Sequence, residues 1–307
     1  MNILHTLFPI DLLRRLEVVK RPTPSPWDSD GVPIRERHLV VACSGPNPSL
    51  ARWARHLAWR EYLGAAARSG LLKSPDLVAR LTGVDDDGFR SALAECFAAW
   101  FFSVRRRMVV RPNPASKQTK NFDLSIQDGP VLVNAEVKAP YVPREHSHVT
   151  GDDSSALREA IAKAGDQLPK GQPNVVVLVP LLRTDVASDR NQLLKATIGE
   201  PALNIFVAIG GAPPRKPEPT FLQRGKLAKL WACGGGVFRT DLTRVSAVMT
   251  LEELLEARGD ELRVTRRVVV VHNPFAAVPL RRDFFGRAPQ WVTRNGHMRW
   301  SDRYVGP

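Results

Sequence analysis

The sequence predicts an α/β fold with a mixed central β-sheet flanked by helices, preceded by a helical N-terminal region. Strand-like and helix-like segments alternate from residue 108 to residue 272, which is typical of a sheet covered on both faces. Before residue 108, apolar residues recur at three- and four-residue spacings, which is typical of amphipathic helices. The 307 residues are enough to bury a large core.

The first part of the chain contains the predicted helical region. The segments predicted as helices are 49–70, 74–81 and 85–104. In the second of these, Ser74 is the expected N-cap and Pro75 occupies the first helical position. The third begins with three aspartates, which suit the positive end of a helix dipole. The proline-rich segment 20–35 is expected to be a loop.

The rest of the chain alternates between strands and helices. The predicted strands are 108–111, 121–127, 131–138, 174–182, 204–209, 245–251 and 266–272, and the predicted helices are 154–168, 190–197, 221–233 and 251–258. The β-branched run in 174–182 is typical of a buried central strand. We therefore expect a helical accessory region at 1–87, an α/β core at 88–275, and a basic, aromatic tail at 276–307 that packs on the core.

Composition and charge narrow the function classes. Hydrophobic residues make up 43% of the chain and charged residues 24%, which excludes global disorder. No apolar run approaches the ~20 residues of a membrane helix, so we expect no membrane partner. The three cysteines are too scattered for a disulfide framework or a cysteine zinc site, and we expect a cytoplasmic location. The net charge of +13 favours nucleic acid as a partner, with an ordinary solvated surface as the alternative.

The segment 121–140 predicts a β-hairpin with one apolar and one polar face. Asp128-Gly129 is a strong turn signal between two strands of alternating residues. A turn centred there places Asp123 opposite Asn134. Slipping one strand by a single residue would move its side chains to the opposite face.

Three side chains on the polar face indicate a chemical site. Asp123 and Glu136 lie one diagonal step apart, about 7–8 Å at the backbone, and Lys138 is two residues further along the same face. Two carboxylates at this spacing suit Mg²⁺ or Mn²⁺, which can polarise a phosphodiester and generate a hydroxide-like nucleophile. A lysine beside the metal can stabilise charge on the phosphate. The alternative is a surface ion pair between Glu136 and Lys138.

These residues resemble the core of a known nuclease superfamily. Asp123, twelve intervening residues and Glu136-Val137-Lys138 resemble the D-x(n)-E-x-K pattern of the PD-(D/E)xK superfamily. The resemblance covers about residues 88–275 by order of elements and implies a restriction-endonuclease-like fold. It also implies a Mg²⁺-dependent phosphodiesterase that acts on DNA, with RNA as the less favoured substrate. A homodimer is one oligomeric state that the sequence leaves open. The proline that often precedes the acidic residue is absent, because Phe122 stands there.

The resemblance implies further site residues on two helices. Glu95, in the predicted helix 85–104, is a candidate third metal ligand, and Glu61 is the alternative if that helix is misassigned. Lys163 and Gln167 lie at i and i+4 on one face of the helix 154–168, where they are expected to contact the scissile phosphate. The opposite face carries an apolar stripe that is expected to pack. For all three residues the alternative is an ordinary solvated helix surface.

Two other functions remain open at the level of the sequence. One is a non-catalytic nucleic-acid-binding or scaffold protein that retains a nuclease-like sheet. It would bind nucleic acid with steep salt dependence and without a divalent cation. The other is a different phosphate or phosphodiester enzyme that uses the same cation site.

Overall fold

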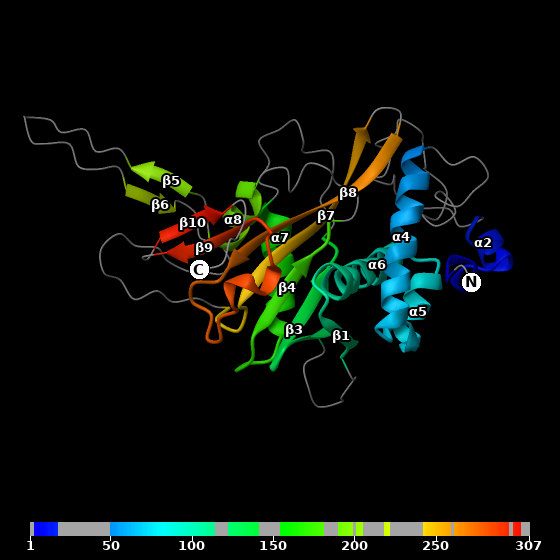
Figure 1. Cartoon of the computed structure of the whole chain (residues 1–307), viewed down its shortest axis with the longest axis horizontal. Helices are drawn as coiled ribbons and strands as arrows, with labels where there is room; N and C mark the ends of the chain where they lie inside the picture. The colour runs from blue at the N-terminus through cyan, green and yellow to red at the C-terminus, as the bar shows by residue number, and fades with distance from the viewer. Residues whose placement is uncertain are drawn as a thin grey trace, which may run out of the picture.

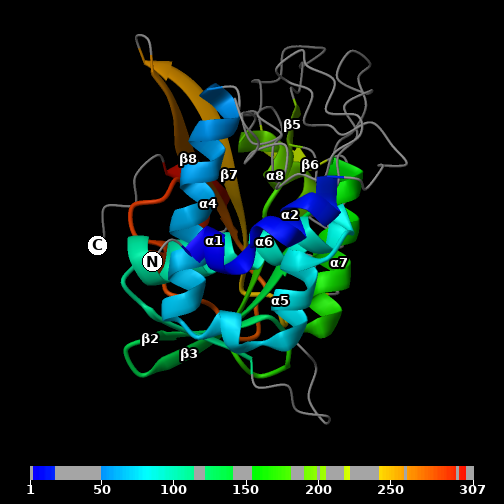
Figure 2. The ribbon, with the colours of Figure 1, turned by 90° about the vertical axis from the view of Figure 1, so that its right-hand side faces the viewer.

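The computed structural model describes ten stretches of the chain. These are residues 3–17, 50–113, 122–140, 154–180, 190–198, 201–204, 218–221, 242–258, 261–294 and 297–301. The predicted loop at 20–35, the predicted helix at 221–233 beyond its first residue, and the predicted strand at 204–209 beyond its first residue lie outside these stretches. The described residues form a mixed α/β structure with helices on both faces of one sheet (Figure 1, Figure 2).

The structure contains the three predicted N-terminal helices and two short helices before them that were not predicted. The helical elements are α1 (Ile3–Leu7), α2 (Ile10–Glu17), α4 (Leu50–Arg68), η2 (Leu71–Lys73), α5 (Pro75–Thr82), α6 (Asp86–Trp100) and the π-helical turn η3 (Phe101–Arg105). The Ser74 side chain accepts the N–H of Leu77, as the predicted N-cap of α5 should. The Asp85 carboxylate accepts the N–H groups of Asp87 and Gly88 at the start of α6. No helix in the described stretches is long and apolar enough to cross a bilayer.

The central sheet has eight strands and mixed direction. In spatial order they are β1 (Val109–Pro112), β2 (Leu124–Asp128), β3 (Val131–Lys138), β4 (Asn174–Leu178), β7 (Ala247–Arg258), β8 (Glu261–His272), β9 (Gln290–Arg294) and β10 (His297–Ser301). The pairs β3–β4, β4–β7 and β8–β9 are parallel, and the other neighbours are antiparallel. β5 (Pro201–Asn204) and β6 (Glu218–Phe221) form a separate two-stranded ribbon.

Each face of the sheet has its own hydrophobic cluster. The helices α4, α5 and α6 pack on one face, and α7 (Ser154–Gln167) and α8 (Arg190–Thr197) pack on the other (Figure 2). Val175 and Val177 of β4 belong to the first cluster, and Val176 and Leu178 to the second, because successive side chains of a strand alternate. This two-sided burial explains the uninterrupted β-branched run in the central strand. The apolar stripe of α7 is buried as predicted.

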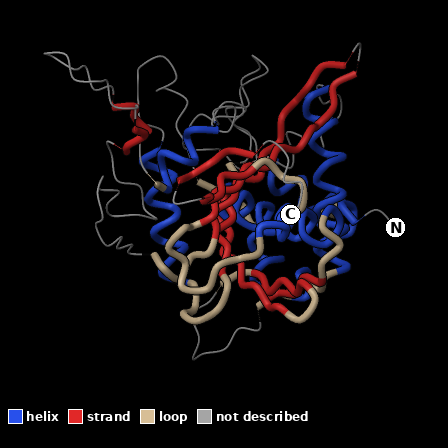
Figure 3. The backbone as a smooth tube through the Cα atoms, turned by 60° about the vertical axis from the view of Figure 1, so that its left-hand side comes forward, coloured by secondary structure: helices blue, strands red, loops and turns tan. Residues whose placement is uncertain are grey.

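The predicted helix at 251–258 is wrong. β7 continues as a strand to Arg258 and pairs with β8 over all twelve residues, so the two form a long hairpin whose outer part runs beside α4 (Figure 1, Figure 3). The sequence of this segment is rich in Leu and Glu, which favour helices. Cross-strand partners override that preference, since Glu252 lies opposite Arg267 and Glu253 opposite Arg266.

The C-terminal tail is part of the same structure. Its residues form β9 and β10, which extend the sheet beyond β8. Phe284 and Phe285 are buried in the first hydrophobic cluster together with Trp59 of α4 and Phe97 of α6. The described parts of the three predicted regions therefore share one continuous core.

Candidate active site

The β2–β3 hairpin carries the predicted acidic residues. Its turn lies one residue further along the chain than predicted. Asp128 pairs with Val131, so Gly129 and Pro130 form a two-residue loop and the predicted centre at Asp128-Gly129 is wrong. Gly129 has a φ of +60°, which suits the first central position of a type II′ turn. Pro130 has its φ fixed at a negative value, which suits the second position and excludes a type I′ turn.

The new register changes the partner of Asp123 but keeps its face. Ser125 pairs with Asn134, and the N–H of Asp123 donates to the carbonyl of Ala135 at 3.1 Å. Asp123, immediately before β2, therefore lies opposite Glu136 and not opposite Asn134 as predicted. The pairing has moved by two residues, and an even shift leaves every side chain on its original side. Residues directly opposite each other are closer than diagonal neighbours, so the two carboxylates lie nearer to each other than predicted.

Asp123 and Glu136 influence each other strongly. One carboxylate oxygen of Asp123 accepts the N–H of Val137 at 2.7 Å. Burial and the charge of Glu136 raise the pKa of Asp123 to about 7. Burial also raises the pKa of Glu136 to about 7, against the opposing effect of the Lys138 charge. The Oε2 atom of Glu136 is buried and has no hydrogen-bond donor among the described residues. A proton or a cation is therefore needed to satisfy this pair.

Lys138 connects Glu136 to the helix on the same face. Its Nζ atom donates to Oε1 of Glu136 at 2.6 Å and to Oε1 of Gln167, the last residue of α7, at 2.7 Å. The Lys138 side chain is 29% exposed, whereas that of Glu136 is only 2% exposed. The amine therefore lies between the buried carboxylate and the solvent.

Glu95 lies near the two acidic residues but has a partner of its own. Its Oε1 accepts from Nη1 of Arg80 at 2.6 Å, and the side chain is buried. Burial and the charge of Asp123 raise the pKa of Glu95 to about 7, and Glu95 in turn raises the pKa of Glu136. Within the described stretches, no three Asp, Glu, His or Cys side chains converge as a metal-binding group. The role of Glu95 as third ligand stays a prediction.

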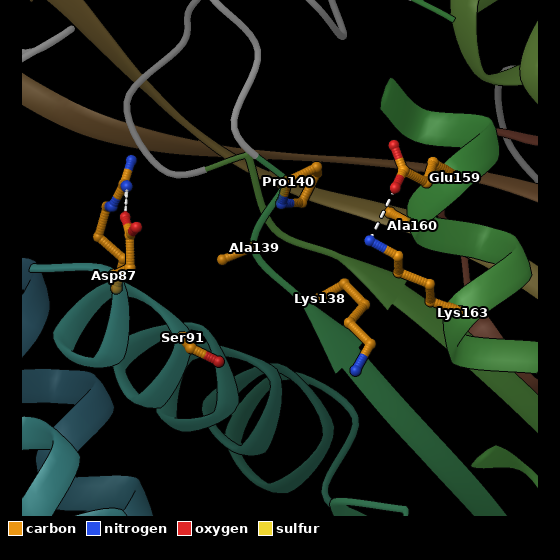
Figure 4. Close-up of a pocket in the computed structure, with 9 residues that line it drawn as sticks. Asp87, Ser91, Lys138, Ala139, Pro140, Glu159, Ala160 and Lys163 are labelled. Carbon is orange, nitrogen blue, oxygen red and sulfur yellow. Dashed lines mark hydrogen bonds and ion pairs between the residues drawn. The ribbon is translucent and has the colours of Figure 1, made fainter. Parts of the chain in front are cut away.

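A pocket of about 400 Å³ opens beside Lys138, between α6 and α7 (Figure 4). Its lining residues are Asp87, Arg90 and Ser91 from α6, Lys138, Ala139 and Pro140 at the end of β3, and Glu159, Ala160 and Lys163 from α7. Lys163 lines this pocket, where its Nζ pairs with Glu159 at 2.7 Å, and its contact with a phosphate stays a prediction. Lys163 and Gln167 thus both face the end of β3, but only Gln167 contacts Lys138.

Sequence reasoning missed the contribution of α6 to this pocket. Arg90 forms an ion pair with Asp87 one turn earlier, and Ser91 is the adjacent hydroxyl. Nothing in the sequence distinguishes these residues from an ordinary helix surface. Only the packing of α6 against β3 brings them to the end of the strand.

The residues present fit a divalent cation between Asp123 and Glu136. Both are hard oxygen donors, and the unpartnered Oε2 of Glu136 is the kind of atom that a bound cation would satisfy. Oxygen ligands from one or two carboxylates, with waters completing the shell, are the usual arrangement for Mg²⁺. The adjoining pocket is large enough for a phosphate group.

Similarity to known proteins adds no information on this site. No family model matches the chain, and neither does any curated protein or solved structure. The chemistry must therefore be inferred from the two carboxylates, the lysine and the pocket themselves.

Proposed function

We propose that this protein is a Mg²⁺- or Mn²⁺-dependent nuclease of the PD-(D/E)xK type, with a restriction-endonuclease-like core, that hydrolyses phosphodiester bonds of DNA. One observation carries the proposal. Glu136 shares its side of the sheet with Asp123 and with the hydrogen-bonded Lys138, and one of its oxygens lacks a donor among the described residues. Antiparallel β1, β2 and β3 followed by parallel β4 support the proposed core.

Each residue has a distinct part in the proposed reaction. Asp123 and Glu136 would hold the metal, which when bound polarises the phosphodiester and lowers the pKa of a water molecule. Lys138 would orient the attacking water and stabilise the negative charge that develops on the phosphate. Gln167 would hold the Lys138 amine in place, because its side-chain oxygen accepts from Nζ.

Two other predicted residues have roles at the edge of the site. Lys163 lines the pocket and forms an exposed ion pair with Glu159. It would release Glu159 and bind a phosphate of the DNA strand instead. The charge of Glu95 would raise the pKa of Glu136, and the ion pair between Glu95 and Arg80 would weaken that effect. Direct binding of Glu95 to the metal would require Arg80 to release it.

DNA is the proposed partner, with RNA as the less favoured substrate. The net charge of +13 supports binding to a polyanion, and the charge includes Arg105-Arg106-Arg107 and the basic residues after Arg281. We place this activity in the cytoplasm, in a monomer or a homodimer.

A cleavage assay tests the proposed nuclease. Supercoiled plasmid, single-stranded DNA and RNA are incubated with the protein in Mg²⁺, in Mn²⁺ and in EDTA. Cleavage is expected with a metal and not with EDTA, and Glu136→Gln and Lys138→Ala are each expected to lower the rate at least 100-fold. Lys73→Ala, on the exposed surface of η2, is the control and should cleave at the wild-type rate. Equal rates in all variants would remove the proposal.

The low exposure of Glu136 favours a second candidate function. A site in which this carboxylate is 2% exposed and paired with Lys138 is suited to a non-catalytic nucleic-acid-binding protein. Such a protein would bind DNA equally well in EDTA, with affinity that falls steeply as salt is raised. Binding without cleavage in the same assay would favour this candidate over the nuclease.

A further inference from the structure

A second pocket lies at the other end of α6. It encloses about 280 Å³ and is lined by the C-terminal part of α6, by η3, by β7 and β8, and by residues 285–289. It shares no lining residue with the pocket beside Lys138. On α6 the nearest lining residues are Ser91 of the first pocket and Phe97 of the second, and a helix rise of ~1.5 Å per residue separates them by about 9 Å along the helix axis. The second pocket is therefore a separate site.

Four arginines line this pocket, and two of them are held in place by the protein. The Nε atom of Arg106 donates to the carbonyl of Phe284 at 2.9 Å. Arg266 forms an ion pair with Glu61 at 2.6 Å, and its guanidinium lies 4.3 Å from the centroid of the Trp100 ring. The Arg266 guanidinium is thus a fixed, flat cationic surface that its neighbours prevent from rotating away.

The other two arginines, Arg105 and Arg287, are available to a ligand. Both are exposed, and neither forms an ion pair with any residue in the described stretches. Arg105 ends the π-helical turn, an irregularity that is frequent at functional sites. Arg287 follows Gly286, which has a φ of +66° and where a Cβ would collide with the guanidinium of Arg106. The backbone geometry before Arg287 therefore requires glycine.

The remaining lining residues in the described stretches are apolar, and none of them is acidic. Buried Leu251 and Phe285 contribute to it, together with Val268 and Pro289. Free guanidinium groups bind phosphate through paired hydrogen bonds, whereas a flat apolar surface beside an arginine plane suits a stacked base. A volume of about 280 Å³ is at the small end of ligand pockets, which suits one nucleotide and is too small for a duplex.

We propose that this pocket binds a single nucleotide, with its phosphate on Arg105 and Arg287 and its base against Arg266 and the apolar wall. The nucleotide is either free or the terminal residue of a strand, since both present the same phosphate and base. The proposal does not depend on the nuclease activity, because it uses neither the acidic pair nor a metal.

Calorimetric titration with AMP in EDTA tests this site, because EDTA removes any contribution from a metal. The full-length protein is expected to bind AMP more tightly than adenosine or inorganic phosphate, each of which offers only half of the contacts. The double variant Arg105→Ala/Arg287→Ala should weaken AMP binding at least 10-fold. The control Arg111→Ala removes an exposed arginine of β1 outside the pocket and should change binding less than 2-fold. Circular dichroism checks that all variants fold.

Two results would overturn the proposal. One is AMP binding that survives in Arg105→Ala/Arg287→Ala but is lost in Lys138→Ala, which would place the nucleotide in the first pocket. The other is no binding of AMP or of a 5′-phosphorylated trinucleotide by the wild-type protein. Tighter binding of the trinucleotide supports a strand end as the ligand, and equal binding supports a free nucleotide. A protein without nuclease activity would still bind AMP, so failure of the two proposals is distinguishable.

Discussion

The amine of Lys138 lies 2.6 Å from the carboxylate of Glu136, two residues earlier on the same strand. Glu136 is almost fully buried, whereas Lys138 retains contact with solvent. A buried carboxylate next to a lysine would ordinarily be stabilised in its charged form, yet burial keeps the pKa of Glu136 at about 7. Glu136 is therefore easier to protonate than an exposed glutamate, because the effect of burial outweighs the attraction of Lys138.

Replacing Lys138 with methionine should destabilise the protein. Lys138→Met keeps the length of the side chain but leaves Oε1 of Glu136 without its donor, which costs about 1–3 kcal/mol. The pKa of Glu136 should rise further, because a positive neighbour is lost. Urea denaturation at pH 8 measures the free energy of unfolding.

Lys163→Met is the matched control for that experiment. Its ion pair with Glu159 joins two side chains that are 71% and 68% exposed. Water screens such a pair, so this variant should unfold at the same urea concentration as the wild type. Equal stability of Lys138→Met and wild type would show that the Glu136 contact contributes nothing to folding.

Addition of Mg²⁺ or Mn²⁺ should raise the melting temperature. A cation between Asp123 and Glu136 would bind only the folded state, and at a metal concentration of 100 times Kd it would add about 2.7 kcal/mol to stability. Thermal denaturation with increasing metal measures this effect. In Asp123→Asn and Glu136→Gln the shift should disappear, and a shift that persists in both would place the metal elsewhere.

Removing the Tyr62 hydroxyl should weaken the outer part of the β7–β8 hairpin. This hydroxyl donates to Oε1 of Glu253 at 2.5 Å and accepts from Nε of Arg266 at 2.9 Å, within a buried contact. Tyr62→Phe should lower the free energy of unfolding by about 1–3 kcal/mol. Glu61→Gln, which alters the half-exposed ion pair to Arg266, should cost less than about 1 kcal/mol. Urea denaturation compares the free energies of unfolding of the two variants. If Tyr62→Phe were as stable as the wild type, the assignment of a strand beyond Leu251 would be contradicted.

Acid should destabilise the protein through His272. Burial lowers the pKa of this side chain below 6.5, and its Nε2 lies 2.8 Å from Oε1 of Gln290. The unfolded chain therefore takes up a proton below pH 6.5 that the folded protein does not, and stability is lost as the pH falls from 6.5 toward the lowered pKa. The loss is about 1.4 kcal/mol for each unit of difference in pKa. The raised pKa values of Asp123, Glu136 and Glu95 act in the opposite direction over this range, so the contribution of His272 is read from the difference between wild type and His272→Gln. Urea denaturation from pH 8 to 5 should show the free energy of unfolding of wild type falling relative to that of His272→Gln, and a constant difference would contradict the assignment.

Local signals in the sequence predicted most of the described elements. The cap at Ser74, the β-branched run of β4 and the helix at 190–197 all carry their information within a few residues, and the structure contains each of them. These features depend on backbone hydrogen bonds and alternation, which neighbouring residues determine. The prediction that Asp123, Glu136 and Lys138 share one side of the hairpin is also correct, because the turn differs from the predicted one by an even change in pairing.

The features that the sequence did not predict depend on distant residues. The segment 251–258 has helical composition, and only its pairing with β8 makes it a strand. The residues of α6 in the first pocket are brought to the site by packing against β3. The hydrogen bond from Lys138 to Gln167 likewise joins residues 29 positions apart.

The alternation of side chains along β3 limits how this hairpin can change during evolution. Deletion of one residue between Val131 and Asn134 would rotate the remainder of β3 by half a turn. Glu136 and Lys138 would then point into the hydrophobic cluster under α6, where neither charge has a partner. Lineages that retain this acid–lysine pair should therefore accept length changes here only in steps of two residues.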